Sequence, residues 1–143
     1  SIVQKETLKR DEQPIVAGLY LNRLNKRMKL ESDPTVIFAL NNFNIKRVLD
    51  KDTKFKSPYN TYLNRGLPPG PITIPSIRAL DSVLNNEKHD YIFMCAKEDF
   101  SGYHNFAVNY TQHLRNAKKY RTALNNKGIK RWKLNLVQTD GEL

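Results

Sequence analysis

The spacing of apolar and polar residues predicts a chain built mostly from short helices. The longest helical pattern covers residues 14–28, where Val16, Tyr20 and Leu24 recur along one stripe. Acidic residues followed by Pro14 mark its start, because the missing N–H of proline does no harm in a first helical turn. Similar patterns predict further helices over residues 33–40, 45–49, 76–84 and 109–124.

The helix over residues 76–84 has a clear apolar stripe. Ser76 is a suitable N-cap for it. We expect this helix to bury the side that carries Ile77, Leu80, Val83 and Leu84.

A short hairpin is predicted after that helix. Residues 91–96 form an apolar run of strand length, residues 99–102 are typical of a turn, and residues 104–108 can form the returning strand. The predicted fold class is therefore α+β, a mainly helical single domain with a small antiparallel β-hairpin. We assign residues 1–126 to this domain and residues 127–143 to a C-terminal tail whose structure the pattern does not predict.

A long connection over residues 57–72 contains the run Pro68-Pro69-Gly70-Pro71, which restricts the backbone tightly. Ordered loops of this kind are either binding surfaces or rigid linkers, and the sequence leaves both readings open.

Composition narrows the class of protein. With 143 residues, 39% of them hydrophobic, the chain is long enough for one real core. It has no apolar run of membrane-spanning length and no signal peptide, and because it opens within a helical pattern we expect it to be part of a longer protein. Its single cysteine, Cys95, excludes an internal disulfide and a multi-cysteine metal site. The net charge of +10 suits nucleic acid, an anionic membrane or an acidic polymer equally.

Three ionisable residues are candidates for chemistry. Glu6 follows the apolar pair Ile2 and Val3, so it can point into a cleft beside a packed helix, where shielding from water raises a carboxyl pKa and suits a general acid. The alternative is an ordinary solvated glutamate. Asp33, before Pro34, is expected to be an N-cap or a binding residue. His104 is either a structural histidine or a substrate ligand.

Several motifs together resemble the endolytic murein transglycosylase family, the YceG-like proteins. The resemblance covers about residues 1–126, in the family's order. The motifs are Ser1-Ile2-Val3-x-Lys5-Glu6-Thr7, Val16-Ala17-Gly18 with Leu21-Asn22-Arg23-Leu24, Ser32-Asp33-Pro34-Thr35-Val36-Ile37, Tyr59-Asn60-Thr61-Tyr62, Gly66-Leu67-Pro68-Pro69-Gly70-Pro71-Ile72 and Gly102-x-His104-x-Phe106. Spore cortex-lytic enzymes share a similar pattern, and their acid also aligns with Glu6.

The resemblance implies a bacterial cell-envelope enzyme that cuts peptidoglycan glycan strands internally and needs no cofactor or metal. It implies an N-terminal membrane anchor outside this chain, a catalytic domain on the outer side of the membrane, and the wall-synthesis machinery as a further partner. Glu6 takes the place of the catalytic acid and is expected to serve as both acid and base. Many relatives have another acid two residues earlier, where this chain has Gln4.

We expect Glu6 to lie in a groove walled by the proline-rich segment. The substrate-binding candidates are Ser32, Asp33, Thr35, Asn60, Thr61, Tyr62 and His104.

Three other functions remain open from the sequence. One is a glycan-binding domain without catalysis, which would follow if Gln4 stood at the critical position. Another is an aminodeoxychorismate lyase-like enzyme, which would need pyridoxal phosphate on a lysine, although the sequence has no Gly-rich phosphate loop. The last is a nucleic-acid-binding module, but the basic residues are spread along the chain and most aromatic residues lie in apolar runs.

Overall fold

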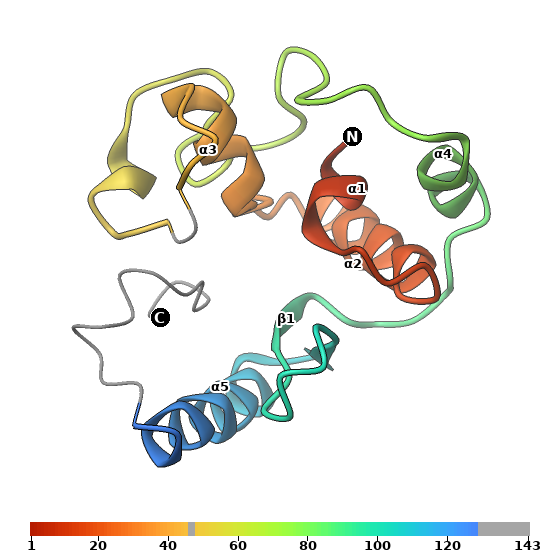
Figure 1. Ribbon diagram of the computed structural model, residues 1–143. Helices are drawn as coiled ribbons and strands as arrows, with labels where there is room; N and C mark the ends of the chain where they lie inside the picture. Colours follow the sequence, from red (N-terminus) through yellow and green to blue (C-terminus); the bar gives the residue numbers. More distant parts are fainter. Residues whose placement is uncertain (46–47, 129–143) are drawn as a thin grey trace.

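A computed structural model describes residues 1–45 and 48–128, which fold as helices around one small hairpin (Figure 1). The helical elements are α1 (Ile2–Glu6), α2 (Gln13–Asn25), α3 (Asp33–Leu40), the 3-10 turn η1 (Asp52–Lys54), α4 (Ile77–Leu84) and α5 (Tyr110–Asn126). The strands are β1 (Phe93–Ala96) and β2 (His104–Ala107), which pair antiparallel. The predicted fold class, mainly helical α+β with an antiparallel hairpin, is confirmed.

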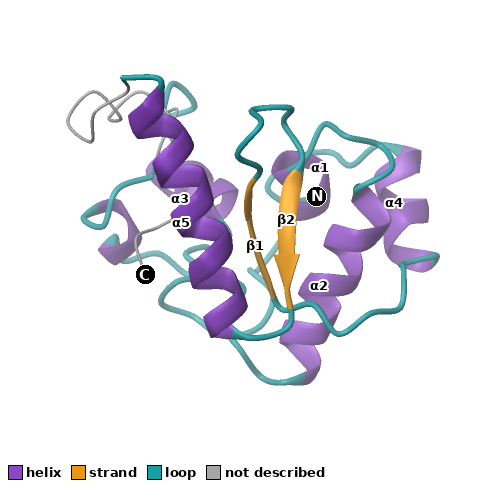
Figure 2. Ribbon diagram, turned by 90° about the horizontal axis from the view of Figure 1, so that it is seen from below, coloured by secondary structure: helices purple, strands orange, loops and turns teal. Residues whose placement is uncertain are grey.

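The hairpin stands between α5 on one side and α1 and α2 on the other (Figure 2). The main core lies on the α1–α2 side, where Ile2 and Val3 of α1 are buried with Val16 and Leu19 of α2. The apolar pair of α1 therefore anchors this five-residue helix. Glu6, its last residue, is held at a fixed place beside the core.

Helix α2 is tied to the segment that leads into β1. The Asn22 side-chain amide donates hydrogen bonds to the carbonyls of His89 and Tyr91, at 2.7 and 3.0 Å. The Arg23 side chain is buried, and its Nε donates to the Ile92 carbonyl at 2.6 Å. From the sequence, Asn22 and Arg23 could be solvated or could support packing. These hydrogen bonds show that the pair supports the packing of α2 against the segment before β1.

The orientation predicted for α4 is wrong. Ser76 caps the helix as expected, with its Oγ accepting a hydrogen bond from the Ala79 N–H at 3.2 Å. However, Ile77 is 79% exposed and Leu84 is equally exposed, while Ala79 and Ser82 are buried. Because α4 packs on α2, its small residues give the closer approach, and the apolar stripe faces solvent.

The proline-rich segment does not wall the cavity that contains Glu6. Leu67, Pro68 and Pro71 instead line a second, apolar cavity of about 350 Å³ against α1 and α2. Ile72 is buried, and its N–H donates to the Ser1 Oγ at 3.2 Å. Of the whole connection over residues 57–72, Tyr62 alone is among the described residues that line the Glu6 cavity. The expectation that the proline-rich segment walls the groove around Glu6 is therefore wrong.

Three further expectations concern smaller elements. Residues 45, 48 and 49 are not helical, although a helix was predicted over residues 45–49. The 3-10 turn η1 follows them, and residues 46–47 lie outside the described residues. Most of the predicted tail, residues 129–143, also lies outside them. Cys95 is buried and is not part of a disulfide. Within residues 1–45 and 48–128, every helix is too short or too polar to cross a bilayer.

Candidate active site

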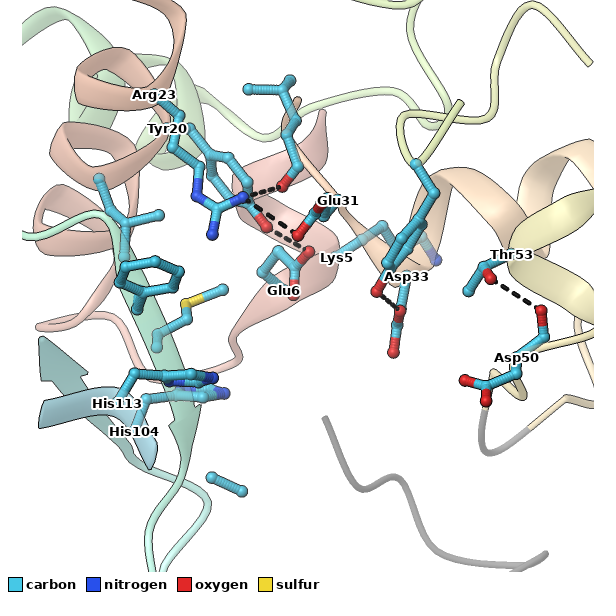
Figure 3. Close-up of a pocket in the computed structure, with 16 residues that line it drawn as sticks. Lys5, Glu6, Tyr20, Arg23, Glu31, Asp33, Asp50, Thr53, His104 and His113 are labelled. Atoms are coloured by element: carbon cyan, nitrogen blue, oxygen red, sulfur yellow. Dashed lines mark hydrogen bonds and ion pairs between the residues drawn. The ribbon is translucent and has the colours of Figure 1, made fainter. Parts of the chain in front are cut away.

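A cavity of about 290 Å³ opens beside the end of α1 (Figure 3). Apolar side chains from α2 and the hairpin form part of its wall, among them Leu19, Phe93 and Met94. The remaining lining is largely ionisable or hydroxyl-bearing, and consists of Lys5, Glu6, Tyr20, Arg23, Glu31, Asp33, Asp50, Thr53, Tyr62, His104 and His113. An apolar wall facing polar groups is the composition expected of a site for a small ligand or one unit of a polymer.

Glu6 is held in this cavity by two hydroxyl groups. Its Oε1 accepts hydrogen bonds from the Tyr20 hydroxyl at 2.6 Å and from the Ser32 Oγ at 2.7 Å. Burial, followed by the charge of Glu6, raises the pKa of Tyr20 well above its ordinary value, so Tyr20 remains a proton donor at neutral pH. The carboxyl group of Glu6 is thus partly buried and fixed in orientation, as a proton-transfer group requires.

The start of α3 contributes Ser32 and Asp33, and the predicted capping role of Asp33 is wrong. Ser32 is the N-cap residue and Asp33 the first residue of the helix, and the cap has no side-chain hydrogen bond. The Ser32 hydroxyl turns to Glu6, and the Asp33 carboxylate accepts a hydrogen bond from the Tyr62 hydroxyl at 2.5 Å. Burial and the charge of Asp33 raise the pKa of Tyr62, which keeps this hydroxyl protonated.

Four predicted substrate ligands lie behind the cavity wall. Ser32, Thr35, Asn60 and Thr61 are almost fully buried and are not among the lining residues. The Thr61 Oγ1 accepts the Ser32 N–H at 2.9 Å and lies 2.8 Å from the Thr35 Oγ1. The Asn60 side-chain amide donates to the carbonyls of Thr53 and Phe55. The geometry of the last three supports positioning of Ser32 and the 53–55 turn rather than substrate contact.

His104 lines the same cavity as Glu6, and a residue that sequence reasoning missed holds it. The Nδ1 of His104 lies 2.9 Å from the Oε2 of Glu12, which is only 3% exposed. His113 of α5 was also missed; it is buried and stacks on Phe93, with 5.1 Å between ring centroids. Burial, followed by the charges of Arg23 and Arg121, lowers the pKa of His113. The one sequence signal for Glu12 was an acidic residue two positions before Pro14, at the start of a predicted helix.

Gln4 is hydrogen-bonded to the segment that leads into α4. Its Oε1 accepts the Ser76 N–H at 2.5 Å, and its Nε2 donates to the Ile74 carbonyl at 3.5 Å. Gln4 therefore fastens α1 to the start of α4 and is not a lining residue. This placement favours Glu6 over position 4 as the reactive site.

Comparison with known proteins identifies the family. Residues 1–119 match the sequence pattern of the YceG-like family. The chain belongs to the YceG-like family. A crystal structure of a YceG-like protein from Listeria monocytogenes shares the fold, with a TM-score of 0.75 and 36% identity over 80% of this chain and 37% of that chain.

Two relatives of known name are similar in sequence over most of this chain. A protein of Bacillus subtilis (strain 168), named endolytic murein transglycosylase, is 35% identical over 127 residues, which are 89% of this chain and 34% of that protein. A protein of the same name from Streptococcus pneumoniae (strain D39) is 35% identical over 124 residues, which are 84% of this chain and 22% of that protein. The chain thus spans about a third or less of the length of these relatives.

Proposed function

We propose that this chain is the catalytic part of an endolytic murein transglycosylase. The substrate is a peptidoglycan glycan strand, and the bond cleaved is the β-1,4 link between N-acetylmuramic acid and N-acetylglucosamine. One observation carries the proposal: Glu6 is fixed by Tyr20 and Ser32 in a cavity of a chain that is 35% identical to relatives of that name.

The chemistry begins with Glu6 in its protonated form. Because both hydroxyl donors bond Oε1, the acid carries its transferable proton on Oε2. That proton moves to the glycosidic oxygen as the C1–O4 bond breaks, and positive charge develops at C1 of the muramoyl unit. The muramoyl 6-hydroxyl attacks C1, passes its proton to a basic group of the cavity and closes a 1,6-anhydro ring, so no water is consumed. A raised pKa of Glu6 remains a prediction of this scheme.

The remaining polar groups of the cavity fit one sugar unit. Tyr62 and Asp33 form a hydrogen-bonded pair at the wall, which suits contact with sugar hydroxyl or acetamido groups. Met94 offers an apolar surface to the sugar ring. Peptidoglycan lies outside the cytoplasm, so we place the action of this domain there. The membrane anchor and the wall-synthesis partners implied by the family resemblance stay predictions.

The proposal is tested with Glu6→Gln on purified sacculi, by mass analysis of anhydromuropeptides. Glutamine keeps the shape of the side chain but holds no transferable proton, so we expect the rate to fall about 100-fold or more. Glu87→Gln makes the same chemical change at an exposed position outside the cavity and should retain the wild-type rate. New anhydro ends that arise from cuts within the strands, and not only at their original termini, support endolytic cleavage.

Two results would count against the proposal. Undiminished release of anhydromuropeptides by Glu6→Gln would remove Glu6 from the acid role. A wild-type protein that binds sacculi but releases no such product would favour the non-catalytic glycan-binding function instead.

A further inference from the structure

A buried carboxylate links the Glu6 segment to His104. The Oε2 of Glu12 accepts a hydrogen bond from the Thr7 hydroxyl at 3.0 Å and lies 2.9 Å from His104 Nδ1. The Oε1 of Glu12 accepts the backbone N–H of His104 at 2.6 Å. Thr7 directly follows Glu6, so one side chain positions both the proposed acid and the histidine.

This contact determines which nitrogen of His104 is basic. Glu12 acts as an acceptor in all three hydrogen bonds, so the Nδ1 of His104 must carry a proton and donate it. In the neutral imidazole, Nε2 is then the nitrogen with the lone pair. His104 lines the same cavity as Glu6, and its ring reaches from β2 toward that space (Figure 3). A carboxylate that fixes a histidine tautomer is the arrangement by which proteins orient an imidazole base.

We propose that His104 Nε2 is the base that takes the proton from the muramoyl 6-hydroxyl, and that Glu12 is its positioning residue. This inference rests on the proposed transglycosylase function. Glu6 gives its proton to the leaving O4 as the C1–O4 bond breaks. O6 forms the new bond to C1 while its proton passes to Nε2. His104 later loses that proton to solvent and Glu6 regains one, so atoms and charge balance over the cycle.

The placement of the two groups allows such a division of work. Glu6 and His104 line the same cavity from two different elements, the end of α1 and the start of β2. The family resemblance implied that Glu6 alone performs both transfers, and the His104–Glu12 pair supplies a second group for the second transfer. The other titratable or charged groups that line this cavity are Lys5, Glu6, Tyr20, Arg23, Glu31, Asp33, Asp50, Tyr62 and His113.

The first test is His104→Ala on purified sacculi with added imidazole. We expect the rate of anhydromuropeptide release to fall about 100-fold with sacculus binding retained. Free imidazole should restore part of it, and the restored rate should increase as the pH rises through about 6.5 to 7, where imidazole loses its proton. A rate within about threefold of wild type, or a loss that imidazole does not restore, overturns the proposal.

The second test reads the tautomer of His104 directly and needs no measurement of activity. The chain has three histidines, so ¹⁵N spectra of the wild-type protein can resolve each ring, with His104→Ala to assign the His104 signals. We expect His104 as the Nδ1–H tautomer in the pH range of activity, and loss of that preference in Glu12→Gln. Proton occupancy on Nε2 throughout that range overturns the proposal even if a variant fails to fold.

The two proposals fail in different ways. If the wild-type protein makes no anhydro product, the transglycosylase function is wrong. If Glu6→Gln is inactive while His104→Ala keeps the wild-type rate, the function stands and the role of His104 is wrong.

Discussion

At the scale of single residues, the site depends on which partner each polar atom finds. Glu6 and His104 were identified from the sequence, but Tyr20 was placed only on an apolar stripe of α2 and Glu12 was not singled out. Both reach their partners across long sequence separations, 14 residues for Tyr20 to Glu6 and 92 for Glu12 to His104. Local patterns carry no information about such contacts. The same limit explains why the sequence left Asp33 open as an N-cap or a binding residue.

Tyr20→Phe tests the support of Glu6. Phenylalanine retains the buried ring but removes one of the two hydroxyls on Oε1, so the acid loses its fixed orientation. We expect a fall of about tenfold in kcat on sacculi and a fall of about 1 kcal/mol in the free energy of unfolding. Tyr110→Phe, at an exposed tyrosine, is the control.

A double-mutant cycle distinguishes orientation from general damage. In the Glu6→Gln background the Tyr20 hydroxyl no longer supports an acid, so Tyr20→Phe should reduce the residual rate much less than in the wild type. Equal reductions in both backgrounds would refute a specific role of this hydroxyl.

At the scale of elements, periodicity found the helices but not always the face that each one buries. It placed α2 and α5 within a few residues of their observed bounds, because both have long patterns and clear start signals. For α4 the stripe was identified correctly and its direction was not, since α4 meets α2 through Ala79 and Ser82. The choice between faces is made by the neighbouring element, which the local sequence does not contain.

Gly18 shows how closely α2 approaches the segment before β1. A Cβ at this position would overlap the Glu87 carbonyl and lie 2.7 Å from His89 Nε2. His89 Nε2 is itself 2.8 Å from the Ile15 carbonyl, so the segment has little freedom to move away. We therefore expect Gly18→Ala to lower the free energy of unfolding by about 1–3 kcal/mol, despite the higher helix propensity of alanine.

Urea unfolding measures this effect. Asn25→Ala, at an exposed position of the same helix, should change the free energy of unfolding by less than about 0.5 kcal/mol. A stable Gly18→Ala protein would show that the 87–89 segment can shift, and the proposed reason for glycine in this motif would be wrong.

At the scale of the whole molecule, a stack of side chains joins the α2 side to α5 across the hairpin. The Arg23 guanidinium lies 5.3 Å from the centre of the Phe93 ring, and His113 stacks on that ring at 5.1 Å. Phe93 is in β1, so the stack connects three elements and ends in a buried imidazole on α5. Within the described residues, His113 Nδ1 has no hydrogen-bond partner. A second positive charge at this place would be close to Arg23 and poorly solvated.

The stability of the molecule should therefore depend on the protonation of His113. Its pKa is lowered in the folded protein by burial and then by Arg23 and Arg121, whereas the unfolded chain has the ordinary value of about 6.5. Between these two pKa values the unfolded chain binds more protons, so the free energy of unfolding rises with pH there. The contribution is complete above about pH 6.5 and is lost as the pH falls toward the folded-state pKa.

His113→Gln removes this titration. We expect its free energy of unfolding, measured with urea from about pH 5 to 7.5, to vary less with pH than that of the wild type. Arg115→Gln, which removes a charge from an exposed position of the same helix, should keep the wild-type slope. Because the histidine is connected through Phe93 to Arg23, acid should loosen α5 before the α1–α2 core, and amide exchange on α5 should then increase first. Uniform exchange across both regions would show that the stack does not set the order in which the fold opens.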